Sequence, residues 1–414
     1  MQNNELYPGN RHLMGILNTL CCCITHMLNL IITPVIIYIA KDFGIDNATA
    51  GSAATLHVMA QGIFILISPI MIGWIDNKKT QLIGCTVMIG GALLGFFAPS
   101  FGILRLARII SGAGHGICSG CSNAVIAAWL PPKEKSIFIT ANNLAVAGIA
   151  TIAYTCTVPL YNLFGQSWRA LLLMMAIILA VLNTVWFIFY KDNNVLNEYI
   201  AKENAAAGKK TNAFSGMKEA LSRREVWIYW MFMGAMTIGT NGITTYLPQF
   251  LQSVRGFSDA ASSSILGVAS AVSAGATLIG GVVTTFFGKR KPIIVLSMIC
   301  GISFLTASLL MGSPLSICAL YILYTLATNF RGPAMGTFTT ELKGVTPALT
   351  SSTAAVSFGI GFIGTSLTSP MLKASTNLIG EEYSMLVFIP LMVIGFIFAL
   401  MLPETGPGRA KKTA

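Results

Sequence analysis

Three arginines and three histidines lie inside long apolar stretches of this chain. They are Arg105, Arg108, Arg331, His26, His57 and His115. All fifteen Asp and Glu residues lie in polar segments or at the ends of apolar stretches. An unpaired cation is unfavourable in apolar surroundings. The pattern therefore indicates a ligand that brings its own negative charge, because a guanidinium group binds carboxylate or phosphate oxygens in a bidentate way.

Arg331 is the strongest candidate for an anion-binding residue. It precedes Gly332 and Pro333, and proline removes a backbone donor and loosens a helix. We predict that Arg331 binds a substrate anion. The alternative is that it reaches toward the membrane surface or bonds the carbonyl groups that the proline frees. Arg105 lies near one end of its stretch, and we expect it to reach the membrane interface.

The three histidines are candidates for carrying a coupling proton. Histidine titrates near neutral pH, and no buried carboxylate is available for this role. His26 and His115 fall near the middle of their apolar stretches, and His57 lies in a third. The alternative for each is a hydrogen-bonded histidine that only packs.

Two apolar stretches, 12–40 and 226–252, carry polar residues at three- and four-residue steps. Such stripes must face protein or a cavity rather than lipid. We predict that they line a pathway and hydrogen-bond a polar substrate, the alternative being hydrogen bonds between helices. The candidate substrate ligands on these stretches are Asn29, Asn241, Thr245 and Tyr246.

The elements that position these residues are membrane-spanning helices. Of the 414 residues, 54% are hydrophobic and 10% charged, against about 25% charged in soluble domains. Only helices or closed barrels cross a lipid bilayer, and stretches this long indicate helices. We count twelve: 12–40, 48–75, 80–99, 101–129, 136–164, 168–190, 226–252, 261–287, 292–311, 314–338, 349–376 and 383–402. The sequence predicts an all-α integral membrane protein.

The charged segments predict the domains and the orientation. Residues 1–190 form a first six-helix bundle, 191–225 a linker with an interfacial helix, 226–402 a second bundle and 403–414 a tail. With the N-terminus inside, inner segments hold nineteen Lys and Arg residues and outer segments hold four. This bias places both termini and the linker in the cytoplasm. The net charge of +11 thus reports topology rather than nucleic-acid binding. We expect a monomer in a bacterial inner membrane.

The sequence contains no motif that indicates an enzyme or a cofactor-binding site. Gly359, Gly361 and Gly364 form a G-x-G-x-x-G string, but inside an apolar helix this indicates close packing. No phosphate-binding G-x-x-x-x-G-K-[ST] loop occurs, and the nine cysteines fall inside apolar stretches as small buried side chains. We therefore expect no enzyme activity, no cofactor and no metal.

Two motifs resemble those of the major facilitator superfamily, and the resemblance covers essentially the whole chain. Residues 104–114 are similar to the family's L-x-x-x-R-x-x-Q-G-x-G, which implies a packing role for Arg108 as the alternative to anion contact. Loops 73–79 and 281–291 resemble its G-x-x-x-D-R-x-G-R-R signature, although in the second loop Thr285 replaces the acid of the signature. The resemblance implies a conformational latch made of Gly73, Asp76, Lys78, Lys79, Gly281, Gly288, Lys289 and Arg290.

We therefore expect a secondary transporter of a small organic anion that works by alternating access, as an exchanger or as a proton-coupled carrier. The alternative is an exporter of drug-like or neutral molecules on the same fold. The Gly-Pro-x-x-Gly-Gly run of the family's drug/proton antiporters is missing from the fifth apolar stretch, where residues 147–150 come nearest. Its absence counts against export.

Overall fold

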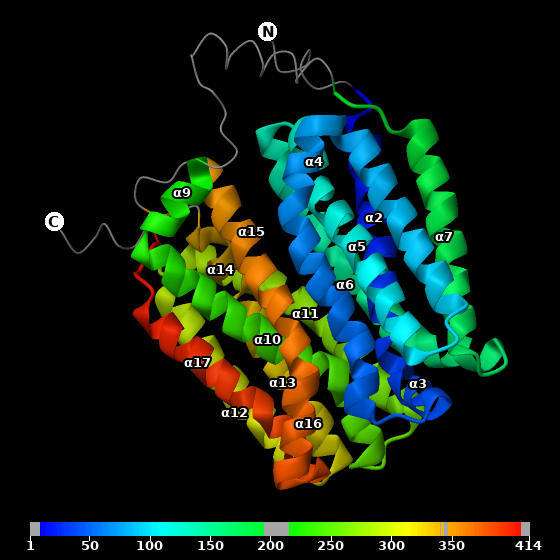
Figure 1. Ribbon diagram of the computed structural model, residues 1–414. Helices are drawn as coiled ribbons and strands as arrows, with labels where there is room; N and C mark the ends of the chain where they lie inside the picture. Colours follow the sequence, from blue (N-terminus) through cyan, green and yellow to red (C-terminus); the bar gives the residue numbers. More distant parts are fainter. Residues whose placement is uncertain (1–8, 194–214, 340, 343–346, 407–414) are drawn as a thin grey trace, which may run out of the picture.

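The computed structural model describes residues 9–193, 215–339, 341–342 and 347–406, and every regular element in these ranges is helical (Figure 1). The first part of the chain forms α2 (Arg11–Leu30), η1 (Thr33–Val35), α3 (Ile36–Phe43), α4 (Asn47–Phe96), α5 (Phe101–Trp129), α6 (Pro132–Leu163) and α7 (Trp168–Phe189). The second part forms α9 (Ser215–Ser222), α10 (Arg224–Ser253), α11 (Asp259–Phe287), α12 (Lys291–Leu310), α13 (Pro314–Phe330), α14 (Gly332–Phe338), α15 (Pro347–Gly364), η2 (Thr365–Leu367), α16 (Thr368–Ile379), η3 (Glu381–Val387) and α17 (Phe388–Met401).

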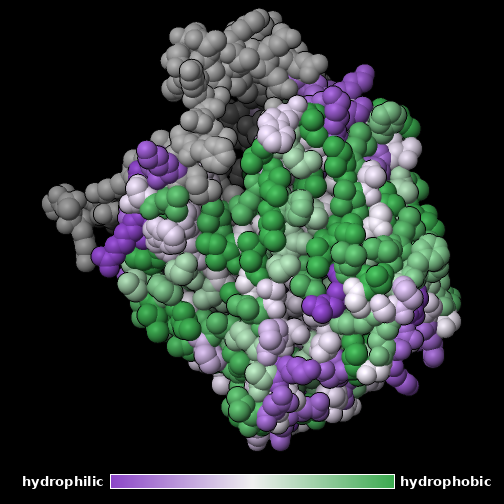
Figure 2. All heavy atoms as spheres, in the orientation of Figure 1, coloured by the Kyte–Doolittle hydropathy of each residue, from purple (hydrophilic) through white to green (hydrophobic). Residues whose placement is uncertain are grey.

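The helices have the length and composition of membrane spans. In the described part of the chain, nine helical segments are long and apolar enough to cross a bilayer. α5, α10 and the pair α13–α14 occupy the three other predicted spans, so the arrangement is consistent with twelve. Apolar side chains cover the middle of the visible surface, and hydrophilic ones gather toward its two ends (Figure 2). The prediction of an all-helical membrane fold is confirmed.

Three predicted spans are interrupted rather than continuous. Pro34 breaks the first into α2, η1 and α3, because it has no N–H to donate to the preceding turn. The tenth is divided at Arg331 into α13 and α14, two residues before Pro333. α15 and α16 are separated by the short η2. Conversely, α4 contains the second and third predicted spans, which meet at Asp76 (φ 73°, ψ 170°).

Each part of the chain builds its own core. α4 packs against α5 and α7, and α2 against α5 and α6, while in the second part α10 packs against α15 and α17, and α12 and α11 against α13. The two halves, residues 9–193 and 215–406, meet where α4 contacts α15 and α16 and where α6 contacts α11. The predicted linker lies mostly outside the described residues, as does most of the predicted tail. We call the end where α2 begins and α17 ends the terminal end, and the opposite one the loop end.

The helices α4 and α5 cross at very close range, and glycine makes this approach possible. A Cβ atom built on Gly112 would lie 2.2 Å from the backbone carbonyl oxygen of His57. One built on Gly91 would lie 2.6 Å from the backbone nitrogen of Ser111. Small residues allow helix backbones in membranes to approach closely, which is how α5 comes to lie directly against α4.

We predict that Gly112→Ala destabilises the protein by about 1–3 kcal/mol, because the added methyl group must push the two helices apart. Thermal unfolding in detergent measures this as a lower Tm. Gly148→Ala on α6 is the matched control, since no atom lies within 4 Å of a Cβ built there. Equal melting temperatures for both variants would contradict the prediction.

Candidate functional site

A cavity of about 1490 Å³ lies between the two halves, and we call it the central cavity. Its walls come from α2 and α6 of the first half and from α10, α11, α13 and α14 of the second. Ile139 and Thr140 near the start of α6 line it, as do Thr285 and Phe286 near the end of α11. All four positions are toward the terminal end. The cavity therefore extends from the middle of the helices to the terminal end.

Hydroxyl groups, amides and aromatic rings dominate the lining. The buried side chains of Tyr154, Tyr321 and Tyr324 lie on its walls. Serines and threonines of α11 and α13 add further hydroxyl groups. Among the described residues that line the cavity there is no Asp, Glu, Lys or Arg, and the imidazole of His26 belongs to the lining. The lining can thus hydrogen-bond a polar ligand but offers it no carboxylate.

Arg331 lies beside this cavity at the break between α13 and α14. It is 7% exposed, and within the described ranges its guanidinium has no hydrogen-bond or ion-pair partner. Tyr324, whose side chain interacts electrostatically with it, lines the cavity, and so do its sequence neighbours Asn329 and Gly332. The partial negative charge at the C-terminal end of α13 offsets part of the cost of burying the cation.

Arg108 is fully engaged by the protein. Its Nε donates to the carbonyl oxygen of Ala53 at 3.1 Å, and its two terminal nitrogens donate to those of Leu28 at 3.1 Å and Asn29 at 3.2 Å. α2 ends at Leu30, and the last carbonyl groups of a helix have no partner within it. Arg108 therefore ties α5 to the end of α2 and to α4. It is 2% exposed and lies outside the lining of the central cavity.

The three predicted histidines come together in the first half. His26, on the cavity wall, places its ring 5.2 Å from that of His115, centroid to centroid. His115 Nδ1 lies 3.1 Å from His57 Nε2, and His57 Nδ1 lies 3.0 Å from the hydroxyl oxygen of Ser111. His57 and His115 are completely buried. A continuous series of titratable groups thus leads from the cavity into the protein.

One arrangement of protons satisfies every contact of this network. In it, Ser111 donates its hydroxyl proton to the carbonyl oxygen of Arg108 at 3.1 Å, and His57 Nδ1 donates to Ser111. His57 Nε2 then accepts, and His115 Nδ1 donates to it. The free His115 Nε2 faces the amide nitrogen of Gln61 at 3.5 Å. With both imidazoles neutral, the hydrogen bond between His57 and His115 is satisfied. A second proton on His57 would place its Nε2–H donor against the Nδ1–H donor of His115.

The other predicted substrate ligands lie outside the lining of the central cavity. Asn29 is held by Arg108, and Asn241 donates to the carbonyl oxygen of Thr237 at 3.0 Å. Thr245 is buried, while Thr240 and Thr244, on the same helix as Asn241, do line the cavity. Polar residues on α11 that were not among the predicted ligands also line the cavity, although their three- and four-residue spacing is visible in the sequence. They are Ser270, Ser273 and Thr277.

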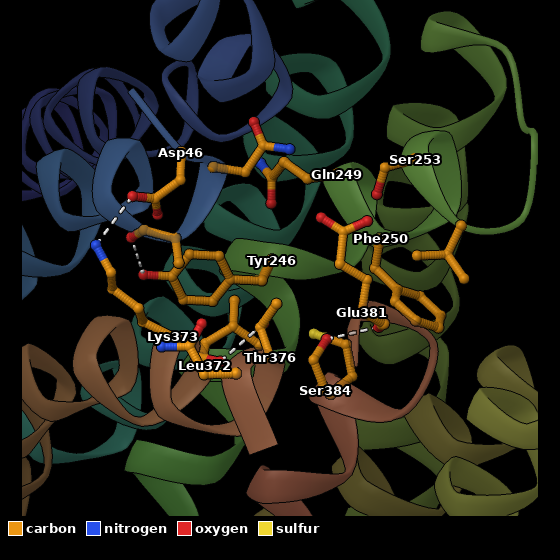
Figure 3. Close-up of a pocket in the computed structure, with 15 residues that line it drawn as sticks. Asp46, Tyr246, Gln249, Phe250, Ser253, Leu372, Lys373, Thr376, Glu381 and Ser384 are labelled. Atoms are coloured by element: carbon orange, nitrogen blue, oxygen red, sulfur yellow. Dashed lines mark hydrogen bonds and ion pairs between the residues drawn. The ribbon is translucent and has the colours of Figure 1, made fainter. Parts of the chain in front are cut away.

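Polar contacts join the two halves at the loop end. Lys373 pairs with Asp46 at 3.1 Å, and the hydroxyl of Tyr246 donates to the carbonyl oxygen of Ala48 at 3.4 Å (Figure 3). Further bonds of this kind link Tyr38 to Asp259, Gln249 to the carbonyl oxygen of Thr33 at 3.1 Å, and Ser369 to that of Ala48 at 2.6 Å. Tyr246, a predicted substrate ligand, is thus one of the residues that join the two halves at the loop end.

The latch residues of the second half cap and cross-link helices at the terminal end. Arg290 pairs with Glu341 at 2.7 Å, and Gly288 ends α11 with a left-handed backbone (φ 64°). Glu404, just past α17, accepts hydrogen bonds from the backbone nitrogens of Arg290 at 2.7 Å and Lys291 at 3.2 Å. It thereby caps the start of α12. Lys289 is exposed, whereas Gly281 lies on α11 and lines the central cavity.

The first half has a related arrangement around the Asp76 kink. Asp76 accepts from the backbone nitrogen of Lys79 at 2.9 Å and pairs with its ammonium group at 3.2 Å. The carboxyl group of Asp192, just past α7, interacts with the backbone N–H groups of Asn77 and Lys78. Lys78 also lies 5.3 Å from the centre of the Phe187 ring. The predicted Gly73 precedes this kink in α4.

Fold and cavity define a class: a multi-pass membrane protein of two helical halves with a polar cavity between them. The model of the Major Facilitator Superfamily matches residues 19–369, and the chain belongs to this family. Family and fold indicate a membrane transporter rather than an enzyme.

Known proteins similar to this chain agree with the assignment. An uncharacterized protein of Campylobacter jejuni is 26% identical over 220 residues, which are 53% of this chain and 64% of that protein. The matches with the first three curated relatives span 28% to 64% of their lengths. A bacterial homologue of the lysosomal transporter Spinster, solved inward-facing and unoccupied, has a TM-score of 0.76 at 15% identity, covering 95% of this chain and 97% of its own. A D-xylose-proton symporter has a TM-score of 0.72 at 14% identity, covering 95% and 97%.

Asp192 gives the terminal end a pH dependence. Burial, with the nearby Asp76 carboxylate, raises the pKa of Asp192 from 3.8 to about 6. The folded protein therefore binds more protons than the unfolded chain between these values, so this contribution to stability is lost as the pH rises through about 6. We expect the Tm of the wild type, relative to that of Asp192→Asn, to fall between pH 4 and pH 7. Parallel pH profiles for the two proteins would contradict this assignment.

Proposed function

We propose that this protein is a secondary transporter that moves a small organic anion through the central cavity by alternating access. The observation that carries the proposal is Arg331, a buried guanidinium beside the cavity without a counter-ion in the described part of the chain. Leaving a buried charge unpaired is strongly destabilising. A substrate carboxylate would supply the missing charge and could accept two parallel hydrogen bonds from the guanidinium.

The surroundings of Arg331 support an organic rather than an inorganic anion. The Tyr154, Tyr321 and Tyr324 rings provide apolar faces together with hydroxyl groups, and Asn329 and Thr325 line the same region. A ligand with a carbon skeleton gains from contact with the rings, and its polar groups find hydrogen-bond partners between them. The absence of Asp and Glu from the described lining avoids repulsion of an anionic substrate.

The charge distribution supports a cytoplasmic opening of the cavity. Lys and Arg residues concentrate in segments at the terminal end, which the positive-inside rule assigns to the cytoplasm. The cavity extends to this end, while the polar contacts described above close the loop end. The conformation would then be inward-facing. A bacterial inner membrane agrees with the similarity to a Campylobacter protein.

His26 is the best-placed residue for proton coupling. It lies on the cavity wall, and its ring contacts that of His115. The His57–His115 pair is satisfied by neutral rings, so a proton arriving from the cavity would reside on His26 first. Exchange of one anion for another is the alternative means of coupling, and it needs no titrating group.

A second candidate function is transport of a neutral polyhydroxylated molecule. The tyrosine, serine and threonine side chains of the lining favour it, because hydroxyl groups both donate and accept hydrogen bonds. The solved D-xylose-proton symporter shows that a protein of the same fold carries such a molecule. Under this hypothesis Arg331 would only stabilise the broken helix, and an exporter of neutral compounds would likewise not depend on it.

We predict that a carboxylate or another small anion raises the Tm of the purified wild-type protein, and that Arg331→Gln abolishes this response. A ligand at about 100 times its Kd should stabilise the wild type by roughly 2.7 kcal/mol. The panel consists of mono- and dicarboxylates, inorganic anions, sugars and lipophilic cations.

Arg105→Gln is the matched control, because Arg105 is an exposed arginine on α5. It should keep the response of the wild type. If sugars or lipophilic compounds stabilise the wild type and Arg331→Gln equally, the anion hypothesis is wrong and the neutral-substrate hypothesis replaces it.

We further predict that His26→Gln uncouples transport from the proton gradient. In proteoliposomes, a pH gradient should accelerate uptake of the identified anion by the wild type about tenfold or more but leave the variant unaffected, because glutamine cannot carry the proton. Anion exchange without a gradient should persist in the variant. Gradient-driven uptake by His26→Gln would disprove this role, and a wild type insensitive to the gradient would favour exchange.

A further inference from the structure

Five hydroxyl groups on the wall of the central cavity donate their protons to the protein itself. On α11, Ser270, Ser273 and Thr277 each donate to the backbone carbonyl oxygen three or four residues earlier, at 2.7 to 2.8 Å. On α10, Thr240 and Thr244 do the same at 2.8 Å and 3.0 Å. A carbonyl oxygen can only accept, so the hydroxyl group is the donor in each contact. What these partly exposed side chains offer a ligand is therefore the lone pairs of their oxygens.

These five acceptors all belong to the second half of the protein. Ser270, Ser273 and Thr277 recur at three- and four-residue steps, so they share one face of α11. The neighbouring helix α6 of the first half contributes mostly apolar side chains to the lining, among them Leu144 and Ala147. A ligand in the cavity thus meets a row of hydrogen-bond acceptors on the second half and largely hydrocarbon on α6. The groups that it presents to the second half should be donors.

We infer that the substrate is a hydroxylated carboxylate, a carboxylic acid anion whose carbon skeleton also carries hydroxyl groups. The inference rests on the proposed function, in which Arg331 binds the carboxylate. The hydroxyl groups of the substrate then donate to the serine and threonine oxygens of α10 and α11. Each of these oxygens has two lone pairs and so can accept a bond from the ligand while its own proton stays on the helix. The acceptors on α11 therefore determine which carboxylates the cavity prefers.

The charges around the cavity favour hydroxyl groups over an ammonium group as these donors. Among the described residues that line the cavity there is no carboxylate to neutralise an ammonium group. Arg331 already places a buried positive charge beside the cavity. A second cation without a partner would be unfavourable there, whereas a neutral hydroxyl group needs only a hydrogen-bond acceptor. Hydroxy acids therefore fit the lining better than amino acids do.

Thermal unfolding of the full-length protein in detergent tests this inference with matched pairs of ligands. The pairs are tartrate and succinate, gluconate and hexanoate, and quinate and cyclohexanecarboxylate. Within a pair the carbon skeleton is the same, and only the hydroxyl groups differ. We expect a saturable rise in Tm with a hydroxylated member. Its half-saturating concentration should be about tenfold or more below that of its parent, because the parent leaves the acceptors on α11 without partners.

Ser273→Ala combined with Thr277→Val removes two of the acceptors and should narrow the preference. The half-saturating concentration of the hydroxylated ligand should increase about tenfold, while that of the parent stays the same. Because both ligands are compared in the same variant, a change in its stability does not affect their ratio. Thr306→Val is the matched control: Thr306 donates to the carbonyl oxygen of Ile302 at 2.8 Å in the same way but lies outside the cavity lining. It should keep the wild-type ratio.

The outcomes separate this inference from the proposed function. If the parent carboxylates bind as tightly as their hydroxylated partners, or if the double variant keeps the wild-type ratio, the inference is wrong while anion transport stands. The inference is also overturned if no hydroxylated member gives a saturable shift. Sorbitol carries hydroxyl groups without a carboxylate. If it stabilises the wild type and Arg331→Gln equally, anion transport is wrong, and recognition of hydroxyl groups by α11 stands only if the double variant weakens sorbitol binding.

Discussion

A cation buried among membrane-spanning helices must find oxygen atoms there, and this constraint explains much of the molecule. The described spans supply no deeply placed carboxylate, so the two buried arginines depend on other acceptors. Arg108 uses backbone carbonyl groups of α2 and α4, which become available because α2 ends ahead of Pro34. Arg331 also stands at a helix break, yet no group in the described part of the chain bonds its guanidinium there. One half therefore satisfies its arginine internally, while the other leaves its arginine beside the cavity.

The two halves resemble each other in the way an acidic residue faces the start of a helix. Their sequence motifs are less alike. In each half, an acidic residue three positions past the last helix faces the backbone nitrogens that begin the third span: Asp192 past α7 and Glu404 past α17. The loops themselves differ, since Thr285 replaces the acid of the first half. In the second half Glu341 pairs with Arg290 instead. The same requirement, to satisfy free N–H groups and basic side chains at one membrane surface, is thus met by different residues.

Much of the fold could be predicted because membrane spans leave long apolar stretches in the sequence. α5 begins and ends at the residues predicted for the fourth span, since Ser100 and the Leu130–Pro131 pair bound it. The site was harder to predict. Polar stripes on α2 and α10 were correctly placed on helices, but periodicity cannot tell which of Asn241, Thr244 and Thr245 faces a cavity. That depends on how the halves pack. The meeting of His26, His57 and His115 depends likewise on the Gly112 crossing.

The loop-end contacts also contribute to the free-energy difference between the states with the loop end closed and open. Five polar contacts join the halves there, and at about 1 kcal/mol each they favour closure by about 5 kcal/mol. Inverting a two-state population from 99:1 to 1:99 requires roughly 5.5 kcal/mol of differential binding. A substrate of ordinary micromolar affinity releases more than this in total. Polar contacts of this combined strength thus keep the opposite state within energetic reach of a single bound molecule.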